Sequence, residues 1–206
     1  MFIAVPLPTA VRDQVARIID HLQATDLPVR WIDPDNGHLT LHFLGDVEPE
    51  MAELLRMAMG VALTHHTAFE LRTADPGAFP SARRPRVLWL GLWGQTYRLE
   101  ALYNDLGDFL DDFGLDIEDV PFHPHITLGR VRDVEGLKVG LLPDQVRDAF
   151  ATIQEEGLAA HDSPVPFPIT EIQLVRSHLS KDGPRYEVLA RYTLASAEKE
   201  GSETYH

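Results

Sequence analysis

Apolar residues recur along this chain with two spacings, one typical of helices and one typical of strands. The helical spacing is clearest in 9–23 and 97–113, where apolar residues fall on every third or fourth position. Helices are expected over 9–23, 49–63, 97–113 and 143–151. Strands are expected over 2–7, 29–32, 38–44, 69–73, 86–93, 126–131, 169–176 and 186–194.

The order of these elements favours an antiparallel α+β architecture over a doubly wound parallel sheet. Strands and helices do not alternate strictly, and tight turn signals stand at 33–37 and 180–183. With 206 residues, the chain is long enough for one large domain or two small lobes.

One strand-like motif occurs twice. It reads His38-Leu39-Thr40-Leu41 in the first half and His125-Ile126-Thr127-Leu128 in the second. Since residues two apart on a strand point to the same side, each copy places an imidazole and a hydroxyl on one face. The copies lie 87 residues apart, so we expect a duplicated lobe with a cleft between the two related sheets. Two histidines and two threonines facing one another are suited to acid–base chemistry on a phosphate.

A bare His-x-Thr match is a weak signal. With 10 His in the chain, chance alone would give roughly 0.6 such triplets. A third triplet, His65-His66-Thr67, ends a predicted helix and lacks apolar flanks, so we interpret it as a chance match. The stricter pattern of alternating His, apolar, Thr and apolar residues occurs only at the two motif strands.

Composition narrows the functional classes. The formal net charge of −14 argues against a protein that coats duplex nucleic acid, but a pocket for one phosphate stays compatible with an acidic surface. The chain has no cysteine and no apolar run of about 20 residues. We therefore expect a cytoplasmic protein without a membrane segment, and a monomer by default. The basic turn 83–86 is equally compatible with a solvated loop and with contact to an anionic substrate.

At these residues the chain resembles the two-histidine (2H) phosphoesterases, in the branch of RNA 2′,3′-cyclic phosphodiesterases also called 2′–5′ RNA ligases. The two motifs are the specific part, and the flanking blocks select this branch. The matching blocks are Met1-Phe2-Ile3-Ala4-Val5, Arg30-Trp31, 38–45, Phe79-Pro80, 85–89, 124–130, 176–180 and Tyr186-Glu187-Val188.

The resemblance implies a bilobal fold with two pseudo-symmetric antiparallel sheets, outer helices and a central cleft. We expect a single domain over 1–197 and a disordered tail over 198–206. The resemblance also implies metal-independent hydrolysis of RNA 2′,3′-cyclic phosphate ends to 2′-phosphomonoesters, without a cofactor. In relatives, the same site can also catalyse reversible 2′–5′ ligation of RNA ends. The implied substrates are RNA ends or small nucleotides that carry the cyclic phosphate.

The side chains allow a mechanism to be assigned. We expect His125 as the general base and His38 as the general acid, although the symmetry of the motifs leaves their order open. Thr40 and Thr127 would donate hydrogen bonds to the phosphate, and Arg130 would neutralise its charge.

Further candidate substrate contacts are less specific. His42 and His123 depart from the residues common in relatives, and strand alternation predicts both on the face of the catalytic pair. Alternation predicts Phe43 on the opposite face, in the core, with base stacking as the less favoured interpretation. Arg176 and Ser177 are candidates for phosphate or ribose contact, and Tyr186 for base stacking or core packing.

Two other functions remain open. The histidines at 38, 42, 123 and 125 could instead bind a metal in a phosphohydrolase, which a chelator would inhibit. The fold could also serve as a non-catalytic module that binds nucleotides or RNA ends.

Overall fold

The computed structural model describes residues 1–115, 117, 121–132, 142–159, 164–180 and 183–196. Within these residues the chain forms four α-helices, a short 3₁₀ turn at Pro34–Asn36 and nine strands. The helices are α1 (Thr9–Gln23), α2 (Pro49–Ala62), α3 (Thr96–Asp112) and α4 (Leu142–Glu155). The strands are β1 (Phe2–Pro6), β2 (Val29–Trp31), β3 (His38–Phe43), β4 (Phe69–Phe79), β5 (Val87–Gly94), β6 (His125–Val131), β7 (Pro166–Ile169), β8 (Glu171–Ser180) and β9 (Gly183–Thr193).

The expected α+β class and antiparallel pairing are confirmed. The strands follow the order β7-β4-β5-β6-β3-β1-β8-β9, with β2 paired beside β6. The two expected sheets are the halves of this single path, because β3 and β6 pair at one position, Leu39 with Ile126. The predicted turn residues 181–182 and tail 198–206 lie outside the described residues.

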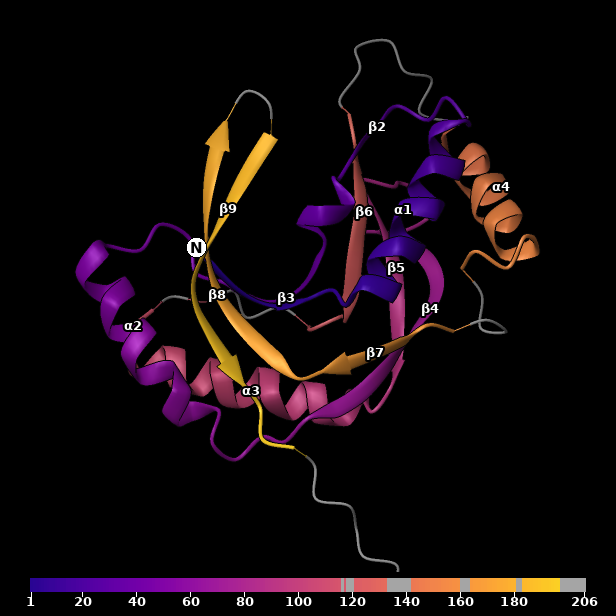
Figure 1. The fold of residues 1–206 in the computed structure, drawn as a ribbon. Coiled ribbons are helices and arrows are strands. Elements are labelled where there is room, and N and C mark those ends of the chain that lie inside the picture. Colours follow the sequence, from indigo (N-terminus) through magenta and orange to yellow (C-terminus); the bar gives the residue numbers. More distant parts are fainter. Residues whose placement is uncertain (116, 118–120, 133–141, 160–163, 181–182, 197–206) are drawn as a thin grey trace, which may run out of the picture.

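Two pairs of helices accompany the two halves (Figure 1). α1 packs against α4 and β7, whereas α2 packs against α3 and β9, and α3 also contacts β3. No helix in the described part of the chain is long and apolar enough to cross a membrane.

The position where β3 and β6 pair, and so connect the two halves of the sheet, is packed into the main hydrophobic core. Leu39 and Ile126 are both fully buried, and they belong to the same core cluster as Val15 of α1 and Leu102 of α3. Since alternate residues of a strand point to opposite sides, His38 and His125 lie on the other face of the sheet. The core therefore supports the two motif strands from behind, where they meet.

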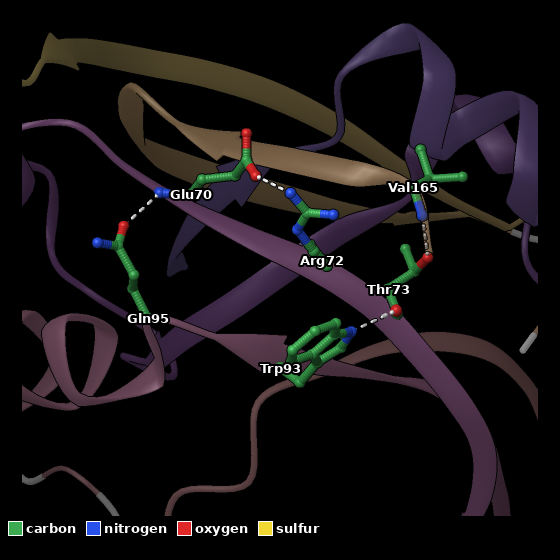
Figure 2. Close-up of polar contacts among 6 residues, drawn as sticks. All are labelled: Glu70, Arg72, Thr73, Trp93, Gln95 and Val165. Carbon is green, nitrogen blue, oxygen red and sulfur yellow. Dashed lines mark hydrogen bonds and ion pairs between the residues drawn. The ribbon is translucent and has the colours of Figure 1, made fainter. Parts of the chain in front are cut away.

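Strand β4 is longer than the sequence predicted. The expected strand ended at Thr73, but β4 runs on to Phe79 past a register shift between Thr73 and Pro76. At the shift, the Trp93 indole N–H donates to the Thr73 carbonyl oxygen at 3.1 Å, and Val165 N–H donates to the Thr73 hydroxyl at 2.9 Å (Figure 2). These bonds satisfy the irregular backbone and let β4 carry Phe79 toward the motif strands.

Side-chain contacts also fix the start of β4. Gln95 accepts a 2.9 Å hydrogen bond from Glu70 N–H, while the Glu70 carboxylate pairs with Arg72 at 3.1 Å (Figure 2).

The strand predicted over 169–176 corresponds to β8, except that its first residue, Ile169, ends a separate strand, β7, that the sequence did not predict. β7 ends at Ile169 and pairs with β4, whereas β8 begins at Glu171 and pairs with β1 and β9. The chain crosses between the two halves at Thr170, and local sequence does not specify this change of partner.

Candidate active site

The two motifs face each other diagonally. β3 and β6 are antiparallel and pair at Leu39 and Ile126. Continuing this register places His38 across from Thr127, and Thr40 across from His125. Diagonal neighbours in an antiparallel pair lie roughly 7–8 Å apart, so one phosphate fits between the two imidazoles. Each histidine thus lies beside the hydroxyl of the other motif.

Both imidazoles are oriented by the backbone two residues earlier. His38 Nδ1 lies 2.8 Å from the Asn36 carbonyl oxygen, and His125 Nδ1 lies 2.6 Å from the His123 carbonyl oxygen. Because a carbonyl oxygen only accepts, Nδ1 carries the hydrogen in both rings. Nε2 is therefore the nitrogen left to exchange a proton with a ligand.

Aromatic rings surround both histidines. Phe2 stacks on His38 with ring centroids 4.7 Å apart, and the edge of Tyr186 meets His38 at 5.4 Å. The ring of Phe79 meets His125 edge-on at 4.9 Å, and Trp89 lies 6.3 Å away.

Burial among these rings changes the acidity of both histidines. For His38, desolvation lowers the pKa, the Asn36 carbonyl opposes this, and the charge of His125 adds to the lowering. For His125, desolvation again lowers the pKa, opposed by the His123 carbonyl, while Arg130 lowers it further. Both rings therefore favour the neutral form more than a histidine in water does.

Both motif strands carry a bulge at the fourth motif residue. In β3, Thr40 pairs with Ala4 and His42 with Ile3, so Leu41 is an extra residue. In β6, Thr127 pairs with Trp89 and Gly129 with Leu88, so Leu128 is an extra residue. A bulge shifts the alternation of side chains by one position beyond it.

The first bulge corrects two predictions on β3. His42 pairs with the core residue Ile3 and is only 4% exposed; its ring stacks on Tyr103 at 4.1 Å, and its Nε2 lies 2.8 Å from the Tyr103 carbonyl oxygen. The predicted shared face with His38 is wrong for His42. Phe43 pairs with Phe2 and is 58% exposed, so its predicted place in the core is also wrong.

The second bulge brings Arg130 to the histidines. Strict alternation would turn a residue five positions after His125 to the opposite face. Arg130 instead lies on the face of His125 and Tyr186, and its positive charge contributes a lowering effect to the pKa of both residues.

The β8–β9 hairpin contributes one of its faces. Ser177 pairs with Tyr186, whose ring contacts Phe2 and His38, so this pair faces the site. Arg176 pairs with Glu187 on the other face. Its positive charge contributes to lowering the pKa of Glu187 and the pKa of the Met1 amino group. The structure therefore does not bring Arg176 to the histidines.

A cavity of about 300 Å³ opens beside the motif strands. Its walls include Thr40, His42, Phe43, Phe79, Phe122, His123 and His125, so His42 borders the cavity although it is almost fully buried. His123 is exposed and its ring lies 6.0 Å from Phe79. Sequence reasoning assigned no role to Phe79, Trp89 or Phe122; the available signals were the matching blocks Phe79-Pro80 and 85–89, which contain Phe79 and Trp89.

The His-x-Thr triplet interpreted as a chance match does not join the site. The third triplet lies after α2, where His66 contacts Asp105 at 2.9 Å. Among the described residues, no three His, Asp or Glu side chains gather in a group that could hold a metal ion.

Comparisons with known proteins agree with this geometry. The family model "LigT like Phosphoesterase" matches residues 5–89 and 94–186. An RNA 2′,3′-cyclic phosphodiesterase of Aeropyrum pernix is 30% identical over 89% of this chain and 97% of its own, and one of Escherichia coli is 30% identical over 94% and 96%. A crystal structure from Thermus thermophilus superposes with a TM-score of 0.69 at 25% identity over 95% of this chain and 97% of the other. The crystal structure of E. coli LigT complexed with 3′-AMP superposes with a TM-score of 0.65 and is 28% identical in sequence, over 94% of this chain and 96% of the other. The chain belongs to the LigT-like phosphoesterases, a family of the two-histidine superfamily.

Proposed function

We propose that this chain hydrolyses 2′,3′-cyclic phosphate ends of RNA to 2′-phosphomonoesters by acid–base catalysis with His38 and His125. The observation that carries the proposal is the matched orientation of the two imidazoles, each with Nδ1 on a backbone carbonyl and Nε2 left for proton transfer. The names of the curated relatives and the 3′-AMP in the LigT complex support the choice of substrate.

The reaction needs one proton taken and one given. His125 Nε2 removes a proton from water, whose oxygen attacks phosphorus as the bond from phosphorus to O3′ breaks. His38 gives a proton to the departing O3′, and the phosphate stays on O2′. Each such transfer typically contributes ~10²–10⁴ in rate.

Arg130 supports this order of roles. Its cationic charge lowers the pKa of His125 and so favours the neutral imidazole, which is the form that a base needs. In ligation, a 5′-hydroxyl takes the place of water as the nucleophile, so His125 accepts its proton and His38 again protonates the departing O3′. The two histidines exchange functions only in the back reaction, when the 2′–5′ bond is cleaved to re-form the cyclic phosphate.

The threonines are placed to stabilise charge on the phosphate. Neither the Thr40 nor the Thr127 hydroxyl forms a hydrogen bond with another described residue, so both can donate to non-bridging oxygens. Arg130 adds positive charge beside His125.

The test is turnover of an oligoribonucleotide that ends in a 2′,3′-cyclic phosphate, with EDTA present. We expect wild type to form the 2′-phosphate, and His38→Ala and His125→Ala each to lower kcat by about 10²–10⁴. His65→Ala, which removes an exposed histidine outside the site, is the matched control and keeps wild-type turnover.

Three results would contradict the proposal. Inhibition by EDTA would indicate a metal-dependent hydrolase. Absence of turnover with retained binding would indicate a binding module. Formation of the 3′-phosphate would show that O2′, not O3′, is the leaving group.

A further inference from the structure

Two arginines stand directly opposite each other on the neighbouring strands β2 and β6. Arg30 of β2 pairs with Arg130 of β6, so their side chains leave the same face of the sheet. Both are exposed. Arg130 marks this face as that of the histidines, because its charge acts on His125 and Tyr186.

Arg30 also reaches the other half of the sheet. A Cβ built on Gly183, the first residue of β9, would lie 3.6 Å from a terminal guanidinium nitrogen of Arg30. Tyr186, three residues further along β9, contacts His38. The Arg30 guanidinium therefore spans from β2 to the hairpin that borders the catalytic histidine.

This pairing of like charges is unfavourable by itself. Residues of the same charge directly opposite on neighbouring strands destabilise a sheet. Neither Arg30 nor Arg130 forms an ion pair or a side-chain hydrogen bond with another described residue, although the chain has 32 acidic residues against 18 Lys and Arg. An anionic ligand would remove the repulsion and use both guanidinium groups.

We infer that Arg30 binds a second phosphate of the substrate, the one on the 5′ oxygen of the ribose that carries the cyclic phosphate. This inference rests on the proposed function. In the proposed reaction, the reacting phosphate would lie between the motif histidines near Arg130 of β6, and Arg30 lies on the neighbouring strand β2. The nearest other anion in an RNA end is the 5′-side phosphate of the same nucleotide. Arg30 thus sets a preference for substrates with two phosphates.

Three substrates separate this role from general electrostatics. Adenosine 2′,3′-cyclic phosphate carries only the reacting phosphate, its 5′-phosphorylated form adds a terminal phosphate, and the dinucleotide ApA with a 2′,3′-cyclic end adds a phosphodiester. Arg30→Ala should lower kcat/KM about tenfold for the two larger substrates and by less than twofold for the first. The dependence of log kcat/KM on log salt should flatten by about 0.7 for ApA, the contribution of one phosphate contact on a single strand.

Controls keep the result interpretable. Arg17→Ala removes an exposed arginine from α1, whose buried face packs in the core behind the motif strands, and should leave all three substrates unaffected. Arg30→Gln keeps most of the aliphatic stem but removes the charge, so it should show the same substrate-dependent loss even if the shorter alanine side chain impairs folding. A loss confined to ApA would identify the phosphodiester, and a loss shared with the 5′-phosphorylated mononucleotide would identify any 5′-phosphate; both support the inference.

An equal loss on all three substrates, no loss on any, or the same pattern in Arg17→Ala would overturn it. Inactivity of the wild type toward all three would contradict the proposed function instead.

Discussion

Leu41 of β3 and Leu128 of β6 occupy the same position in the two motif strands, and each is the extra residue of a bulge. Both side chains are buried, and the residue two positions later is exposed on the face of the histidines. That later residue is Phe43 in one strand and Arg130 in the other. The paired bulges therefore supply the site with one aromatic and one cationic side chain at matching places.

Phe43 should contribute to substrate binding and little to stability. Its ring is 58% exposed and lines the cavity beside the histidines. Stacking of a base on an aromatic side chain is worth ~1–3 kcal/mol, so Phe43→Ala should lower kcat/KM about tenfold or more. The melting temperature should stay near that of wild type. Met57→Ala, at a 69% exposed position on α2, is the matched control for loss of an exposed apolar side chain.

Replacement of Arg130 should change the pH profile as well as the rate. Its charge lowers the pKa of His125, so Arg130→Gln should raise that pKa and move the acid limb of kcat/KM toward higher pH. Loss of a charge-assisted contact to phosphate should also lower kcat/KM by about 10-fold to 100-fold. The measurement is the pH dependence of kcat/KM together with an NMR titration of His125. An unchanged acid limb with a lower rate would show that Arg130 acts on the substrate alone.

Stability should fall on mild acidification. The folded pKa values of His38, His42 and His125 lie below the unfolded value of about 6.5. Below that pH the unfolded chain binds more protons, so the free energy of unfolding decreases as pH falls from about 6.5 through the folded pKa values and is level above 6.5. Urea unfolding at pH 7.5, 6.5 and 5.5 measures this. The double variant His38→Gln/His125→Gln should show a shallower loss, and His65→Gln the same loss as wild type.

Gly77 should not tolerate a side chain. An added Cβ would overlap two ring atoms of Trp89, which packs beside Phe79 and His125. Gly77→Ala should therefore displace the indole, lower stability by roughly 1–3 kcal/mol and reduce turnover. At Gly60 of α2 the added Cβ would make an ordinary 3.6 Å contact with Tyr192. Gly60→Ala should keep full activity and raise stability by roughly 0.5–1 kcal/mol. Equal tolerance of both changes would show that Trp89 can shift freely.

The sequence predicts the elements and the first four residues of each motif well, because these depend on local periodicity. His38 and Thr40 share a face as expected, and so do His125 and Thr127. The prediction fails from the fifth residue, where His42 and Phe43 exchange faces. A bulge exists where two residues of one strand lie opposite one residue of its partner. The sequence of one strand alone does not show how its partner is aligned with it, so it does not predict the bulge.

The same limit explains the remaining differences. The sequence pattern predicts one strand over 169–176 and none over 166–168. Only the change of partner at Thr170 separates Ile169, the last residue of β7, from β8. The strand predicted over 69–73 ends before Pro76, Gly77 and Phe79, yet pairing with β5 keeps Phe79 in a strand. Long-range pairing decides each of these cases.

The position of β1 has a consequence for the order of folding. β1 lies between β3 and β8, so its two neighbours come from opposite ends of the sequence. β4, β5 and β6 are consecutive strands and can pair early during synthesis. β1 can pair with β8 only after Val175, the partner of Phe2, has been made. The half-sheet that bears His38 is therefore completed last, only after β8 has been synthesised.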